Sequence, residues 1–141
     1  MDGVMIKNQT SDNQRILLLS AKGVEEIQTL VAIVSLGLCR ALASGVIGPT
    51  YACARLFGPA LLTRMESLGS LAELREAVHL ATELEDVSEL VPHALQESIQ
   101  EIEAKLVSAI GSLAAESTDG EKWLVPDAAM NNEVNNRNQV E

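Results

Sequence analysis

His79 is the side chain whose sequence context comes nearest to a chemical site. Glu83 follows it by four residues, which places the two side chains one turn apart on a helix expected over 71–84. The pair could supply two metal ligands, or a general acid with an orienting carboxylate. Zinc needs at least three protein ligands, and the other histidine, His93, belongs to a different expected helix. We therefore expect an exposed Arg75–His79–Glu83 ladder, and keep a metal site or enzyme centred on His79 and Glu83 as the alternative.

Other signatures of catalysis are missing from the sequence. It contains neither a GxSxG nucleophile elbow nor a GxxxxGK[ST] phosphate loop. Cys39 and Cys53 are 14 residues apart and form no CxxC pair, which argues against zinc and favours two buried small apolar side chains. We expect no catalytic residue, no metal site and no cofactor, and hence a protein that is not an enzyme.

Acidic residues concentrate in one interval of the chain. From Glu76 to Ala104 there are eight acids and no base. The eight are Glu76, Glu83, Glu85, Asp86, Glu89, Glu97, Glu101 and Glu103. A surface carrying them would attract a basic partner and would compete for sites that normally contact nucleic acid. The alternative is an ordinary solvated face that gives solubility.

Composition narrows the class of protein. The chain has 141 residues, 10 basic and 20 acidic side chains, a net charge of −10 and 47% apolar residues. That length fits one domain with a packed core, and the negative charge disfavours binding to nucleic acid. The polar N-terminus has no long apolar stretch typical of a secretory signal, so we expect a cytoplasmic protein. Arg40 divides the apolar region 27–54, which favours core helices over a membrane span.

The first strong helical pattern runs from about Val24 to Ser44, with Gly45 as its C-terminal stop. Gly37, Ala41 and Gly45 recur at intervals of four and form a stripe of small residues. We expect another helix of the same chain to cross closely near Ala41. A structural homodimer that buries this stripe is the alternative.

Further helices follow at short intervals. Pro49 and Pro59 are expected at helix starts, with ends near Phe57 and Gly69. Capping boxes are predicted at Ser70–Glu73, opening the helix over 71–84, and at Asp86–Glu89, opening a single turn before Pro92. A helix over 93–115 has the most regular apolar stripe, made of Leu95, Ile99, Ile102, Leu106, Ile110 and Leu113. The fold class predicted is all-α, a compact bundle of five to six helices with a disordered C-terminal tail.

Both ends of the chain differ from the centre in composition. We expect a loose N-terminal segment over 1–22, a helical domain over 23–115 and an acidic, Asn-rich disordered tail over 116–141. Ile16–Leu19 fits either a short strand or a docking segment. The segment around Trp123 stands out in the tail, and could dock back, engage a partner or stay mobile.

Three short segments carry a resemblance to a known family. They are Gly37, Ala41-Leu42, Gly45 and Ile47 with Arg55–Pro59; His79–Val87; and the following Pro92. Over roughly residues 30–113 the chain resembles a bacterial family of small helical proteins of uncharacterised function. The resemblance implies a compact bacterial helical domain and no particular activity.

These observations together favour a small acidic protein-binding domain. An immunity or antitoxin-like inhibitor would fit, with its carboxylate-rich face occluding a basic partner such as a toxin. The chain has only three aromatic side chains, Tyr51, Phe57 and Trp123. It therefore has few of the residues that most often dominate the energy of binding interfaces.

Overall fold

The computed structural model describes residues 15–116 and 120–127. In these residues it contains six α-helices and one short 3₁₀ helix. They are α2 (Val24–Ala43), α3 (Pro49–Arg55), α4 (Pro59–Ser67), α5 (Ala72–Thr82), α6 (Leu84–Leu90), η1 (Pro92–Ala94) and α7 (Leu95–Glu116). The prediction of an all-α bundle with five to six helices is confirmed. The tail beyond residue 127, predicted as disordered, lies outside the described residues.

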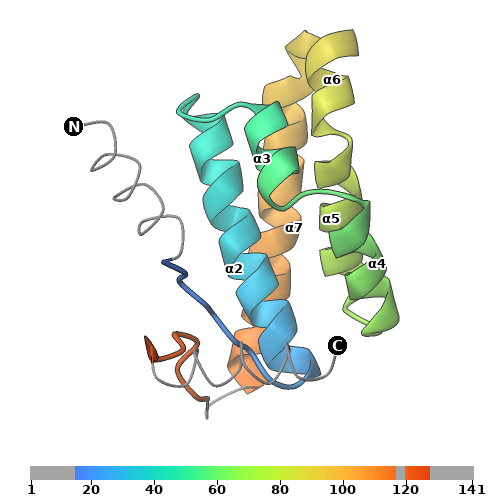
Figure 1. Ribbon diagram of the computed structural model, residues 1–141. Helices are drawn as coiled ribbons and strands as arrows, with labels where there is room; N and C mark the ends of the chain where they lie inside the picture. The colour runs from blue at the N-terminus through green and yellow to red at the C-terminus, as the bar shows by residue number, and fades with distance from the viewer. Residues whose placement is uncertain (1–14, 117–119, 128–141) are drawn as a thin grey trace, which may run out of the picture. The chain divides into compact units, whose positions relative to one another are not determined.

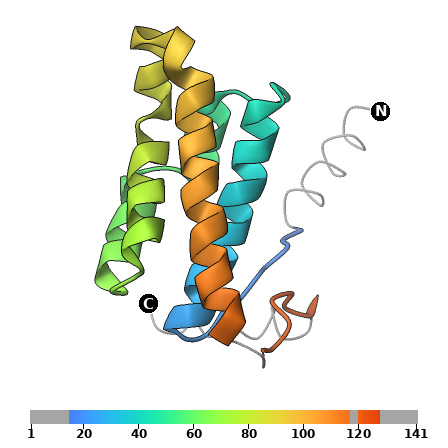
Figure 2. The ribbon, with the colours of Figure 1, turned by 180° about the vertical axis from the view of Figure 1, so that it is seen from behind.

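The described residues between 22 and 120 form one compact unit with an up-and-down arrangement of helices. The long helices α2 and α7 run antiparallel and lie side by side in both views (Figures 1 and 2). α3 and α4 together make the return leg after α2, and α5 and α6 make the next leg upward (Figure 1). Two of the four legs are therefore broken helices, whereas α2 and α7 are continuous.

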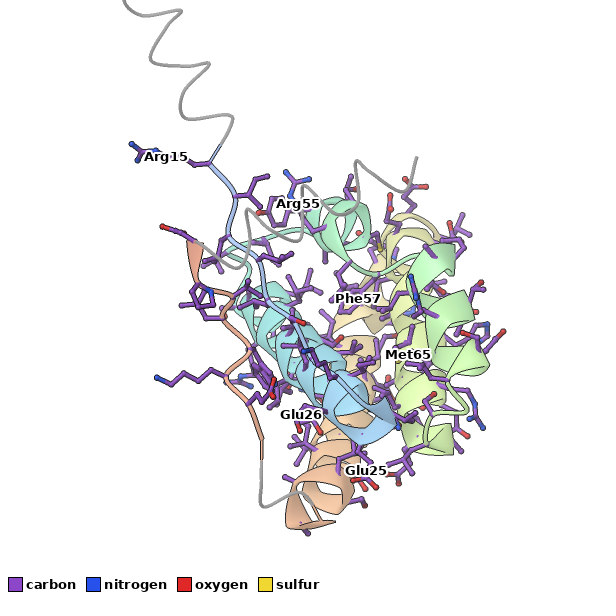
Figure 3. All side chains as sticks on the ribbon, turned by 60° about the horizontal axis from the view of Figure 1, so that its bottom comes forward. Arg15, Glu25, Glu26, Arg55, Phe57 and Met65 are labelled. Carbon is purple, nitrogen blue, oxygen red and sulfur yellow. The ribbon has the colours of Figure 1, made fainter. Side chains whose placement is uncertain are left out.

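The core of this unit is made by one face of each long helix and by the shorter helices around them. Phe57 and Met65 are its largest fully buried side chains, and both lie among the helices in Figure 3. The predicted stripe on α7 is confirmed, because four of its six members are buried and Leu95 and Ile110 pack against the core. Ala109 joins them as a buried residue that the stripe did not include.

Gly45 ends α2. Gly45 follows α2 with a φ of 76°, a left-handed conformation that glycine adopts without steric cost. Its N–H donates to Leu42 O, and the next N–H, of Val46, donates to Ala41 O, which is the Schellman arrangement. The predicted stop at Gly45 is confirmed.

The capping box predicted at Ser70 is wrong. Leu71 occupies the N-cap position of α5, no side chain of the box bonds the first turn, and the buried Ser70 hydroxyl has no hydrogen-bond partner. Instead, Gln28 Oε1 on α2 accepts a hydrogen bond from the Leu71 N–H at 2.9 Å, and Arg75 donates to the Ser70 carbonyl. The backbone at the start of α5 is therefore capped by a side chain of α2, which is distant in the sequence, and not by a local side chain.

The second predicted capping box, at Asp86, is wrong as well. α6 begins at Leu84 with Glu83 at its N-cap, so Asp86 lies in the first turn and does not cap the helix. α6 therefore begins three residues earlier than the local motif predicts, and the fully buried Leu84 shows that core packing favours this earlier start.

The close helix crossing predicted near Ala41 is also wrong. Gly37 lies on the exposed side of α2, and a Cβ added there would meet nothing within 4 Å. Gly45 likewise has open space around it and serves as a helix stop. The two glycines of the stripe therefore do not make room for another helix of the same chain, although Ala41 between them is half-buried.

A second unit joins described residues from both ends of the chain, 15–21 and 121–127. Leu19 and Leu124 form an isolated antiparallel β-bridge. The Ser20 N–H donates to Trp123 O at 2.7 Å, and the Val125 N–H donates to Leu18 O at 3.0 Å. The segments around Leu19 and Trp123 therefore pair with each other, while residues 1–14 lie outside the described residues.

α2 is the one helix in the described part of the chain that is long and apolar enough to cross a membrane, judged by length and composition. Six of its 20 residues are buried in the helical unit.

Candidate interaction surface

The eight acidic residues singled out in the sequence come from three consecutive helices. Glu76 lies on α5 and Glu83 at the α5–α6 junction. Glu85, Asp86 and Glu89 lie on α6, and Glu97, Glu101 and Glu103 on α7. They do not all share one surface, because several bind basic or polar side chains of neighbouring helices.

Two of the eight carboxylates serve to join helices. Glu76 accepts a hydrogen bond from Lys105 Nζ at 3.0 Å, which links α5 to α7 and raises the pKa of the lysine. Glu103 pairs with Arg40 on α2 at 3.4 Å, and its other carboxylate oxygen is buried without a hydrogen-bond partner. Because both carboxylates already pair with a basic side chain of a neighbouring helix, we do not include them in the candidate surface.

Two further carboxylates have weaker contacts. Glu83 Oε1 lies 3.5 Å from His79 Nε2, and both side chains are largely exposed. Glu85 accepts from the Thr50 hydroxyl at 3.5 Å, which connects α6 to α3. Since both distances are long for hydrogen bonds, these two residues keep most of their capacity to bind an external cation.

The end of the unit at α6 combines acidic and apolar exposed groups. A shallow hollow of about 230 Å³ is lined by Glu83, Asp86, Val87, Leu90 and Val91. The Leu90 side chain is 78% exposed. The hollow is smaller than the pockets that usually hold small molecules, and suits one inserted side chain of a partner better. We call these five lining residues together with Glu89 the α6 surface.

Charge on the α6 surface is not balanced within the described residues. Asp86 and Glu89 form no ion pair with any of them, and no basic residue lies between Glu76 and Ala104. Asp86 is in the first turn of α6, where the helix dipole stabilises a negative charge. Glu89 is in the last turn, where the same dipole opposes it, so helix stability does not account for Glu89.

Metal binding and thiol chemistry find little support in the described residues. No three His, Cys, Asp or Glu side chains among them are close enough together to hold a metal ion, at His79 or elsewhere. Burial, together with the nearby Glu103 carboxylate, raises the pKa of the Cys39 thiol to about 12. Burial also raises the pKa of Cys53, whose Sγ lies 3.7 Å from Ala81 O. Neither thiol forms a disulfide.

Sequence reasoning did not anticipate the exposed apolar pair Leu90 and Val91. Both precede Pro92, and a residue directly before proline disfavours the α-helical conformation. α6 therefore ends at Leu90 and does not continue into a longer helix. The signal was a short helix whose last residues are apolar and are followed directly by proline.

Comparison with known proteins identifies a family. Residues 22–125, well over half of the chain, match the family described as "Protein of unknown function (DUF3969)". The chain belongs to this family. Its matched region contains the whole helical unit and extends beyond the segment 30–113 on which the resemblance was noticed. No curated protein and no solved structure matches the chain.

Proposed function

We propose that this chain is a non-catalytic binding domain whose α6 surface holds a basic segment of a partner protein. The observation that carries the proposal is the exposed Leu90 beside Glu83, Asp86 and Glu89, with no basic side chain on α6. Exposed leucine next to uncompensated carboxylates is typical of a surface that receives an apolar anchor flanked by cationic groups.

The two kinds of group would contribute differently to the complex. The carboxylates speed the encounter through the long-range field of a chain whose net charge is −10. Leu90 and Val91 contribute after contact, because their apolar area is removed from water. Binding of this kind weakens steeply with salt but retains an apolar part that salt does not remove.

The class of partner follows from the same chemistry. A protein with a basic working surface, such as a toxin or nuclease, would lose access to its target when that surface is covered. This is the action of an immunity or antitoxin-like inhibitor, and it requires no catalytic residue on the inhibitor.

A matched pair of variants tests the proposal. The first removes three charges from the α6 surface by Glu83→Gln, Asp86→Asn and Glu89→Gln. The control removes three exposed charges elsewhere by Glu25→Gln, Glu66→Gln and Glu73→Gln, so that net charge changes equally. Each immobilised protein is exposed to a native-host extract at low salt, and the partner that is recovered is purified for direct titration.

We expect wild type and control to recover the same basic protein. At about 1 kcal/mol for each lost charge, the α6 variant binds it about 100-fold more weakly. Equal recovery by the α6 variant and the control, or recovery of no basic protein by wild type, would show that the α6 surface is not the binding site.

A further inference from the structure

The exposed side of α2 carries large apolar side chains. Ile33 and Val34 are 42% and 40% exposed, and no charged residue lies between Glu26 and Arg40. The buried side contains the polar Gln28, Thr29 and Ser35 beside Ala32, Cys39 and Leu42. An amphipathic helix at the surface of a monomer turns polar side chains toward water, and the exposed residues between Glu26 and Arg40 are not polar.

The neighbouring helix α7 continues this uncharged surface. Val107 is 57% exposed, Gly111 and Ala114 are exposed as well, and no charged residue occurs between Lys105 and Glu116. α2 and α7 lie side by side, and the Arg40–Glu103 ion pair joins them toward one end. We call the half-buried Leu30 and the exposed Ile33, Val34 and Gly37 of α2, with the exposed Val107, Gly111 and Ala114 of α7, the α2–α7 face.

Both helices contain an interior glycine on this face. A Cβ added at Gly37 or at Gly111 would meet nothing within 4 Å. Glycine within a helix is less stable than alanine, because it loses more backbone freedom on folding. Packing inside one copy of the chain therefore gives no steric reason for either glycine, whereas close approach of a second helix from outside would require a small residue.

We propose that the α2–α7 face binds a second copy of this chain. In the complex α2 packs antiparallel on α2 and α7 on α7, so that the two faces form a four-helix interface. The contact is independent of the α6 surface and of the function proposed for it.

Charge along α2 favours this partner and fixes the register. Glu26 and Arg40 are each seven residues from Ile33, or about 10 Å along the helix. Antiparallel packing centred on Ile33 therefore places Glu26 of each copy opposite Arg40 of the other. The Arg40 side chain is 73% exposed, and so can contact a second carboxylate beside its own Glu103.

The size of the face sets the strength of the contact. The 15 residues from Glu26 to Arg40 span about 21 Å between the first and the last, and two adjacent helices are about 20 Å wide. The area is then about 400 Å² in each copy and about 800 Å² in total, at the low end for protein complexes. We expect a reversible dimer that forms at high micromolar concentration. Salt should strengthen it, since two chains of net charge −10 repel each other.

Sedimentation equilibrium of the full chain between about 10 µM and 1 mM tests the proposal. Wild type should move from the mass of one copy toward two, and further at higher salt. Gly37→Arg should remain a monomer, while Thr63→Arg, at an exposed site on α4, should dimerise as wild type does. The open space at Gly37 makes the arginine compatible with the fold, and an unchanged circular dichroism spectrum and melting temperature would establish this.

Cysteine cross-linking tests the register. Ile33→Cys should form a disulfide-linked dimer under mild oxidation, whereas Val46→Cys, which is exposed outside the face, should not exceed wild type. A wild type that stays monomeric at 1 mM, a Gly37→Arg variant that dimerises normally, or equal cross-linking at both cysteines would overturn the proposal. Monomeric wild type that co-sediments with phosphatidylcholine vesicles would assign the face to lipid, and would overturn it too.

Discussion

Gln28 on α2 forms a hydrogen bond to the backbone at the start of α5. Its Oε1 accepts from the Leu71 N–H at 2.9 Å, its Nε2 donates to Val24 O at 3.2 Å, and the residue is buried. Gln28→Ala leaves the Leu71 N–H without an acceptor at a site from which water is excluded. An unsatisfied buried donor costs about 1–3 kcal/mol, so we expect a loss of about 2 kcal/mol in the free energy of unfolding.

Urea denaturation followed by circular dichroism measures this loss. For a helical unit of this size, 2 kcal/mol corresponds to a fall of about 10 °C in melting temperature. Gln100→Ala, at an exposed position on α7, is the control and should change stability by less than about 0.5 kcal/mol. If Gln28→Ala cost no more than the control, the proposed capping of α5 from α2 would be refuted.

Three further predictions concern burial, thiol ionisation and the helix dipole. Leu106→Ala on the buried stripe of α7 should cost about 2.5–5 kcal/mol in urea denaturation, and its exposed neighbour Val107→Ala less than about 0.5 kcal/mol. Folding raises the pKa of Cys39 from 9.0 to about 12, so above pH 9 the unfolded thiol ionises while the folded thiol stays neutral. Stability should therefore fall between pH 9 and pH 12 by up to about 1.4 kcal/mol per pH unit from this thiol, and Cys39→Ala should make the slope shallower, while the raised pKa values of Cys53 and Lys105 keep part of it. An equal slope in both proteins would contradict the assignment. Glu89→Lys should raise stability by about 0.5 kcal/mol, because it places a cation in the last turn of α6, and should weaken partner binding; a loss of stability would contradict the role given to the dipole.

Much of the fold could be predicted from local sequence signals. Pro49, Pro59 and Gly45 mark helix ends through backbone geometry that depends on the residue itself, and all three are found where expected. The apolar stripe on α7 was predictable for a similar reason, because a period of 3.6 residues identifies the buried face of a long helix.

Features that depend on distant residues could not be predicted in this way. The cap of α5 comes from Gln28, 43 residues before Leu71 in the sequence, so no local motif points to it. The spacing of Gly37, Ala41 and Gly45 predicted a close crossing within the chain, but both glycines have open space around them, because spacing alone does not say which side of a helix packs against its neighbours. Three of the eight candidate carboxylates, Glu76, Glu85 and Glu103, contact neighbouring helices, which charge counting along the chain does not reveal.

The central claim is that the α6 surface receives a basic partner. Nuclear magnetic resonance of the ¹⁵N-labelled full chain, titrated with the basic protein recovered from the host extract, tests it most directly. We predict that the largest changes in amide chemical shift fall on residues 83–91, and that they diminish as salt is raised. Largest changes on α2 or α4, with residues 83–91 unaffected, would contradict the account.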